Sequence, residues 1–270
     1  MHVLSAILIG FGAAVVAGMF GIGGASVTTP AIRVLLGTSP AYSLGTPLPV
    51  TIPTALAGSI TYLRHGLVEK RLAVLCGAGG LVGSVGGALL TGVLNLHYLM
   101  LATGTVVLYL AGMTMYRGIS GRFSTPSPEG GEEEATGEEY AGGPVTFNTA
   151  PALCIGLAAG LFSGLLGVGG GVVLIPSFLY LLRVPIKKAF GTSLTVITVI
   201  AIPGTVVHAF LGHISWSLTL YLVIGAVPGG VIGARLSIRA KERVLYVLFG
   251  SLLAIFGLIF IVNEIISMIG

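Results

Sequence analysis

Long apolar segments follow one another along almost the whole chain, separated by short polar or glycine-rich stretches. Most approach the length of about 20 apolar residues that a helix needs to cross a bilayer. None shows the alternation of apolar and polar positions that is typical of a membrane β-barrel strand. The pattern therefore predicts an all-α polytopic membrane protein with helices near 3–20, 24–37, 43–63, 72–93, 97–116, 149–166, 171–183, 190–211, 217–235 and 244–266.

The composition supports a membrane location and divides the chain into three parts. Of the 270 residues, 54% are hydrophobic and only 8% are charged, against about 25% charged in a soluble domain. Six of the nine acidic residues fall within 117–148, a polar stretch that we expect to be a flexible linker. We therefore expect a first transmembrane repeat over 1–116 and a second over 149–270. The first apolar segment lacks a basic n-region, so we expect a membrane helix there rather than a signal peptide.

An internal repeat relates the two transmembrane parts. A shift of 146 residues places GMFGIGG (18–24) on GLLGVGG (164–170) and Gly45-Thr46 on Gly191-Thr192. The same ungapped register places Gly87-Ala88 on Gly233-Ala234, some 70 residues further along. A register of this length predicts a duplicated membrane unit.

The basic residues predict how the repeats are oriented, because cytoplasmic loops carry the excess of Lys and Arg. With eight simple spans, the two sides would hold 8 and 5 basic residues. If 3–37 and 149–183 instead each enter and return to the same side, Arg33 stands alone on one side. The other side then holds twelve: Arg64, Lys70, Arg71, Arg117, Arg122, Arg183, Lys187, Lys188, Arg235, Arg239, Lys241 and Arg243.

This bias favours two inverted repeats, each a glycine-broken helical hairpin followed by three transmembrane helices. Both termini are then predicted outside, and the linker 117–148 is predicted to be cytoplasmic. The pattern leaves open whether each hairpin is re-entrant or a thin double span, because both have the same parity.

The glycine breaks are the first candidate binding element. Helices interrupted at matching places of inverted repeats indicate a transport site near the bilayer midplane. A helix that starts after such a break directs free N–H groups and a positive dipole end inward, which suits an anion. We expect substrate contacts at Gly23, Gly24, Gly169 and Gly170; the competing interpretation is that these glycines only allow close helix packing.

The second candidate element is GTPLPVTIP (45–53) with its counterpart GTSLTVITV (191–199). Hydroxyl groups can bond an oxyanion, so Thr46, Thr192 and Ser193 are candidate substrate contacts. Four further threonines on the same helices are expected to donate to the carbonyl four residues earlier: Thr51, Thr54, Thr195 and Thr198.

Few other residues in the apolar segments carry chemistry. His208 is a candidate coupling or substrate residue, with packing as the alternative. Arg33 could attract anions, or it could be a helix-end charge that reaches the interface. Cys76 and Cys154 lack CxxC spacing and are expected to pack. The chain contains no HExxH, no GxSxG and no paired membrane carboxylates, so we expect no enzyme, no metal site and no cofactor.

The two motifs together resemble the sulfite exporter TauE/SafE-like family, also called the toluene-sulfonate uptake permease family. The resemblance rests on the paired glycine-rich breaks and on the GTS-L element; Pro47 departs from that element in the first half. It implies a secondary transporter of sulfite, sulfoacetate or other organosulfonates in the inner membrane of a prokaryote. The inverted repeats favour alternating access, and we expect net export because an anion gains free energy on leaving a negative interior. An anion channel, or a carrier of another small organic anion, remains the alternative. The expected partners are the anion and the bilayer, without nucleic acid; a homodimer stays open.

Overall fold

The computed structural model describes residues 3–90, 96–120, 149–166 and 169–269, and these residues form helices and connections without a strand. Most of the predicted linker 117–148 lies outside the described residues. The helices are α1 (Val3–Phe20), α2 (Ala25–Leu36), α3 (Pro40–Gly45), α4 (Pro47–Arg64), α5 (Lys70–Leu90), α6 (Leu96–Ser120), α7 (Thr149–Leu166), α8 (Gly171–Tyr180), α9 (Ile186–Phe210), α10 (Trp216–Arg239) and α11 (Glu242–Ile269).

The all-helical membrane class predicted from the apolar segments is confirmed. Five of the described helices are long and apolar enough to cross a membrane: α1, α5, α9, α10 and the first 18 residues of α11. One predicted segment is divided in the structure. Residues 43–63 were expected to form one helix, but α3 ends at Gly45 and α4 starts at Pro47. Proline suits the first position of a helix because its missing N–H would have no partner there.

Glycines allow two helix pairs to pack backbone against backbone. On α5, a Cβ at Gly79, Gly83 or Gly87 would overlap the carbonyl oxygens of α7. The facing glycines of α7 approach carbonyl oxygens of α5 in the same way, at positions 156, 160 and 164. The pair α1–α10 repeats this arrangement with Gly225, Gly229 and Gly233 on α10. Glycines four residues apart let helices approach closely in membranes, where packing drives association.

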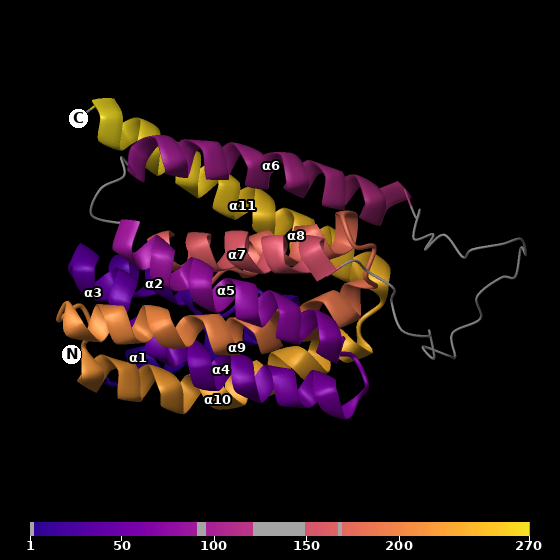
Figure 1. Ribbon diagram of the computed structural model, residues 1–270. Helices are drawn as coiled ribbons and strands as arrows, with labels where there is room; N and C mark the ends of the chain where they lie inside the picture. Colours follow the sequence, from indigo (N-terminus) through magenta and orange to yellow (C-terminus); the bar gives the residue numbers. More distant parts are fainter. Residues whose placement is uncertain (1–2, 91–95, 121–148, 167–168, 270) are drawn as a thin grey trace, which may run out of the picture.

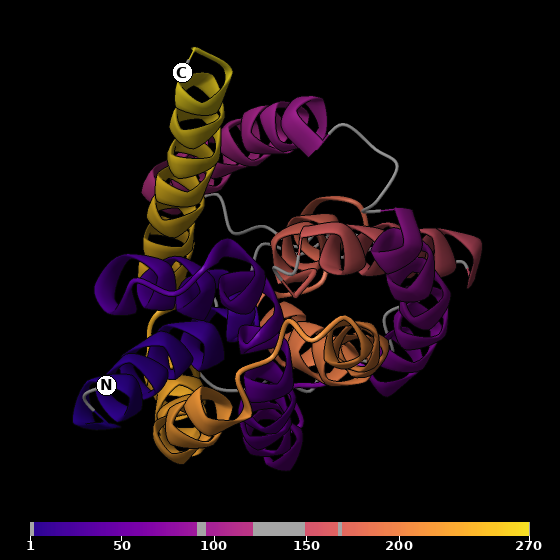
Figure 2. The same ribbon diagram turned by 90° about the vertical axis from the view of Figure 1, so that its left-hand side faces the viewer.

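The helix pairs are related by the same shift of 146 residues that relates the sequences. This shift carries α1 onto α7 and α10 onto α5, so the α1–α10 and α5–α7 pairs are counterparts. It also exchanges α4 with α9 and α6 with α11, and the two members of each of these pairs contact one another. In Figure 2 the α6–α11 pair lies to one side of the other helices. Each of these four helix pairs therefore joins a helix of the first half to a helix of the second half.

The two chain ends lie at the same end of the bundle, on the left in Figure 1 and toward the viewer in Figure 2. The α4–α5, α8–α9 and α10–α11 connections lie at the opposite end. Contacts between these connections agree: Lys188 of α9 bonds Glu69, and the Lys187 ammonium donates to the carbonyl oxygen of Ile238 at 2.8 Å. We call this the basic end, because ten Lys and Arg residues flank its three connections: Arg64, Lys70, Arg71, Arg183, Lys187, Lys188, Arg235, Arg239, Lys241 and Arg243.

Candidate functional site

The two glycine breaks turn the chain between the paired helices α1–α2 and α7–α8. Gly21 and Gly23 have φ angles of 69° and 81°, and Gly169 and Gly170 have 84° and 69°. These angles lie in the left-handed region, which glycine adopts without steric cost. Gly24 is helical, with φ at −62°. The sequence therefore needs glycine at these turns for backbone reasons alone, before any ligand is considered.

The breaks from the two halves lie against each other. A Cβ at Gly171 would stand 2.5 Å from the Cα of Ile22, which leaves room for no side chain at this position. A Cβ at Gly169 would meet the Ile22 carbonyl oxygen at 3.6 Å and the Ala25 Cβ at 4.0 Å. The structure thus brings the first helical turns of α2 and α8 together in the interior.

The hydroxyl group of a threonine on α4 accepts the first backbone N–H of α2. The backbone N–H of Ala25 donates to Oγ1 of Thr51 at 2.8 Å, and the Thr51 hydroxyl donates onward to the carbonyl oxygen of Pro47 at 2.9 Å. The residue 146 positions after Thr51 is Ile197, which has no acceptor atom, and its side chain lies beside Gly23 instead. The two breaks are therefore chemically unequal: a hydroxyl accepts the first N–H of α2, whereas the residue that matches this threonine in the second half has no acceptor atom.

Ser193 connects the second repeat element to the first glycine break. Its hydroxyl donates to the carbonyl oxygen of Gly21 at 2.8 Å, and the whole residue is buried. The equivalent position in the first half is Pro47, whose side chain cannot donate. Of the three hydroxyl candidates, Ser193 is the one whose hydrogen bond reaches a glycine break.

Thr46 and Thr192 form hydrogen bonds just before α10 and α5, away from the glycine breaks. Oγ1 of Thr46 accepts the backbone N–H of Ser215 at 3.1 Å, just before α10, and Oγ1 of Thr192 accepts that of Glu69 at 3.0 Å, just before α5. Both threonines are fully buried. The two bonds are counterparts under the 146-residue shift. They lie in the α9–α10 and α4–α5 connections, at opposite ends of the bundle, so the structure does not bring Thr46 and Thr192 together (Figure 1).

The four threonines expected to bond within their own helices do so. Thr51, Thr54, Thr195 and Thr198 each donate to the carbonyl oxygen four residues earlier, at 2.7–2.9 Å. This prediction is confirmed, although Thr51 also accepts from Ala25 and Thr195 also pairs with the Ser59 hydroxyl at 2.7 Å.

The two other candidate residues, Arg33 and His208, differ in their surroundings. Arg33 is exposed in the last turn of α2. His208 is partly buried near the end of α9, its ring centroid lies 5.5 Å from that of His213, and its Nδ1 has no hydrogen-bond partner within the described parts of the chain. Its counterpart Tyr62 donates to the carbonyl oxygens of Gly18 and Met19 at 3.2 and 3.3 Å, at the end of α1. The contacts of the breaks given above include neither Arg33 nor His208.

Sequence reasoning missed an ion pair at the basic end. The ammonium of Lys188 lies 2.7 Å from the Glu69 carboxylate, with side-chain exposures of 10% and 17%. The signal was present in the sequence, because Glu69 is one of three acidic residues outside 117–148 and it sits among basic residues. Shielded charges of this kind persist only when they are paired.

The two cysteines differ in burial. The Cys76 thiol is buried and donates to the carbonyl oxygen of Ala152 on α7 at 3.1 Å, which fits a packing residue, and Cys154 is exposed. Among the residues that the structure describes, no three His, Cys, Asp or Glu side chains gather closely enough to hold a metal ion.

Several helices long and apolar enough to cross a membrane, with two glycine breaks that meet in the interior, are typical of a multi-pass helical membrane protein. The family model described as "Sulfite exporter TauE/SafE" matches residues 6–260, so the chain belongs to this family of membrane transporters. It is 26% identical over 260 residues to the probable membrane transporter protein YunE of Bacillus subtilis (strain 168), covering 93% of this chain and 94% of that protein.

Two further relatives are similar over different lengths. The probable membrane transporter protein YjnA of the same organism is 24% identical over 264 residues, covering 94% of this chain and 98% of that protein. The probable membrane transporter protein MamO of Paramagnetospirillum magneticum (strain ATCC 700264 / AMB-1) is 37% identical over 113 residues, covering 38% of this chain and 18% of that protein. No solved structure matches the chain.

Proposed function

We propose that this transporter moves sulfur-containing anions, such as sulfite, sulfoacetate or other organosulfonates, across the inner membrane of a prokaryote. The observation that carries the proposal is the contact between the two glycine breaks, where the starts of α2 and α8 meet. The N-terminal ends of two helices bring backbone N–H groups and two positive dipole ends to one place. The family supplies the substrate class. This assignment is to a carrier and not to an enzyme.

The topology that we propose is an inverted repeat. α2 and α8 have 12 and 10 residues, so they are about 18 and 15 Å long, well short of the roughly 30 Å hydrocarbon core. Each returns the chain as a re-entrant hairpin, and three transmembrane helices follow in each half, α4, α5 and α6 in the first and α9, α10 and α11 in the second. The basic end is then cytoplasmic by the excess of Lys and Arg, and both termini are outside.

Within this site the anion binds closer to α8 than to α2. The first N–H of α2 already has the Thr51 hydroxyl as its acceptor, whereas Ile197, the residue that matches Thr51 in the sequence of the second half, has no acceptor atom. Gly169 and Gly170 therefore contribute the principal backbone contacts, and Gly23 and Gly24 form the opposite wall. Thr46 and Thr192 support the site by fixing α10 and α5.

Export follows from the membrane potential. An anion that leaves a negative interior gains about 2.3 kcal/mol per charge for each 100 mV. This gain drives net export without a coupled ion. Access to the site alternates between the two sides of the membrane around the breaks, as in other transporters with inverted repeats.

The test is counterflow in liposomes with the purified full-length chain. Saturable exchange of labelled sulfite or sulfoacetate, with weaker exchange of sulfate and chloride, is expected. Gly24→Leu fills the space beside Thr51, where a Cβ alone would lie 3.4 Å from Oγ1, and should reduce exchange at least tenfold. Gly12→Leu is the matched control, because nothing lies within 4 Å of a Cβ at Gly12. Unsaturable flux would identify a channel instead, and wild-type exchange by folded Gly24→Leu would show that the first break does not form a wall of the site.

A further inference from the structure

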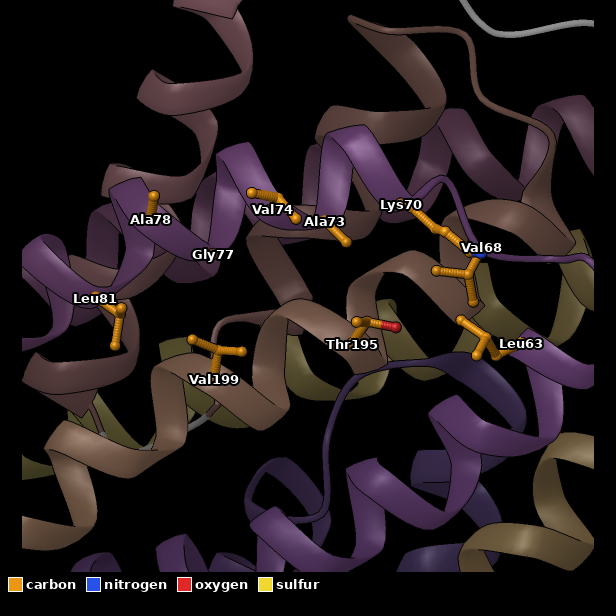
Figure 3. A pocket seen from close by; sticks show the side chains of 10 residues that line it. All are labelled: Leu63, Val68, Lys70, Ala73, Val74, Gly77, Ala78, Leu81, Thr195 and Val199. Atoms are coloured by element: carbon orange, nitrogen blue, oxygen red, sulfur yellow. The ribbon is translucent and has the colours of Figure 1, made fainter.

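An apolar groove opens on the outer face of the bundle between α4, α5 and α9 (Figure 3). Its volume is about 550 Å³, within the range of roughly 300–1,000 Å³ of ligand pockets. Ala73, Gly77 and Leu81 line it from α5, and Thr195 and Val199 from α9. Two of these α5 residues, Ala73 and Gly77, are small, and Leu81 is 39% exposed, so the groove faces the surroundings of the protein.

The groove has one cationic end. Lys70 is the one charged residue among the described residues that line it, and it stands at the first turn of α5, at the basic end. The Thr195 hydroxyl is occupied by Gly191 and Ser59, so it presents no unused polar group to the groove. The neighbouring acid, Glu69, is already paired with Lys188 and does not neutralise Lys70.

The dimensions fit one bilayer leaflet. Lys70 and Leu81 are eleven residues apart on one helix, which corresponds to about 16 Å. Half of a roughly 30 Å hydrocarbon core is about 15 Å. The groove therefore extends from the membrane surface at the basic end to near the midplane, which is the space that one acyl chain occupies.

We propose that this groove binds an anionic phospholipid of the leaflet at the basic end, with an acyl chain along α5 and the phosphate beside Lys70. The cation at the end of an otherwise apolar groove selects an anionic headgroup over a zwitterionic one. A second copy of the chain fits less well, because a parallel two-fold dimer through this face would bring two like-charged groove mouths together. The proposal is independent of the transported substrate.

The experiment is native mass spectrometry of the purified full-length chain after exchange into detergent with phosphatidylglycerol or phosphatidylcholine. Wild-type protein should retain phosphatidylglycerol about fivefold more than phosphatidylcholine, the factor expected for one basic group near an anionic surface. Gly77→Leu should lower the retention of both lipids at least threefold, since a Cβ at Gly77 has only ordinary contacts, the nearest at 3.9 Å to Val199. Lys70→Gln should abolish the headgroup preference without lowering the retention of phosphatidylcholine.

Matched controls separate groove binding from general lipid adhesion. Gly86→Leu changes another open position of α5, with nothing within 4 Å of a Cβ, and Lys241→Gln removes an exposed cation from the same end. Both should behave as wild type. Absence of a phosphatidylglycerol preference in wild type would overturn the proposal, as would equal losses in the controls. A dimer that Gly77→Leu dissociates, or preferential retention of dodecanesulfonate over phosphatidylglycerol, would assign the groove to another occupant. If Gly77→Leu does not fold, the headgroup preference of Lys70→Gln tests the proposal, and an unchanged preference would overturn it.

Discussion

Ser193 and Gly21 are 172 positions apart in the chain, yet the serine hydroxyl donates a 2.8 Å hydrogen bond to the glycine carbonyl oxygen. The bond joins the GTS element of the second half to the glycine break of the first. A carbonyl at a turn between two helices has no partner within a helix, and burial makes an unpaired carbonyl costly. The first half has no equivalent, because Pro47 stands where Ser193 would be.

Removing this hydroxyl should loosen the first break. Ser193→Ala leaves the Gly21 carbonyl without its partner, and we expect the free energy of unfolding in mixed detergent micelles to fall by about 1 kcal/mol. Ser177→Ala is the control, because the Ser177 hydroxyl only bonds back to Val173 in its own helix. Equal stability of the two variants would show that the Ser193–Gly21 bond does not hold the break.

Breaking the ion pair at the basic end should cost more. Glu69→Gln or Lys188→Met leaves one shielded charge without its partner, and each should destabilise the protein by about 3 kcal/mol. The double variant Glu69→Gln with Lys188→Met should lose much less than the sum, because it leaves no lone charge. Melting temperatures of the wild type, the two single variants and the double variant complete the double-mutant cycle. Lys241→Met, at an exposed position, serves as the control. Additive losses would mean that the two side chains do not interact.

Much of the fold could be predicted from the sequence because two signals are local. Apolar runs define helices, and the glycine-rich strings between them define the breaks. Nine of the ten predicted segments correspond to single helices in the structure, with ends that differ by a few residues. The remaining segment was divided at Thr46, where the chain enters α4 at a proline and the apolar pattern alone shows no interruption.

The roles of individual polar groups were harder to predict, because they depend on contacts across the bundle. Thr46 and Thr192 occupy matching positions in the sequence, and this symmetry suggested a shared cavity. Instead their hydroxyls accept N–H groups of Ser215 and Glu69, which are themselves 146 residues apart. The matching positions of Thr46 and Thr192 thus reflect a hydrogen bond that occurs once in each half. The pairing of Glu69 with Lys188 has no counterpart in the other half, where Ser215 and Tyr42 occupy these positions.

Two glycines of α5 should respond differently to substitution, because one packs against α7 and the other faces open space. Gly83→Leu would drive a side chain into the carbonyl oxygen of Leu157 on α7, and we expect destabilisation of at least about 3 kcal/mol or loss of the folded protein. Gly86→Leu on the same helix meets nothing within 4 Å and should change stability by less than about 0.5 kcal/mol. Size-exclusion profiles and melting temperatures measure both. A Gly83→Leu protein as stable as Gly86→Leu would show that α5 and α7 do not pack as closely as described.

Valine at Thr46 or Thr192 distinguishes a helix cap from a substrate contact, because it keeps the shape of the side chain and removes the hydroxyl. As caps, each hydroxyl satisfies the N–H before one helix, and each substitution should cost about 1 kcal/mol of unfolding free energy. The two bonds share no partner and lie at opposite ends of the bundle, so the double variant should lose about 2 kcal/mol. Thr54→Val, which removes only a bond to Val50 within α4, should cost less. Unchanged stability together with a raised KM for the anion would instead make these threonines substrate contacts.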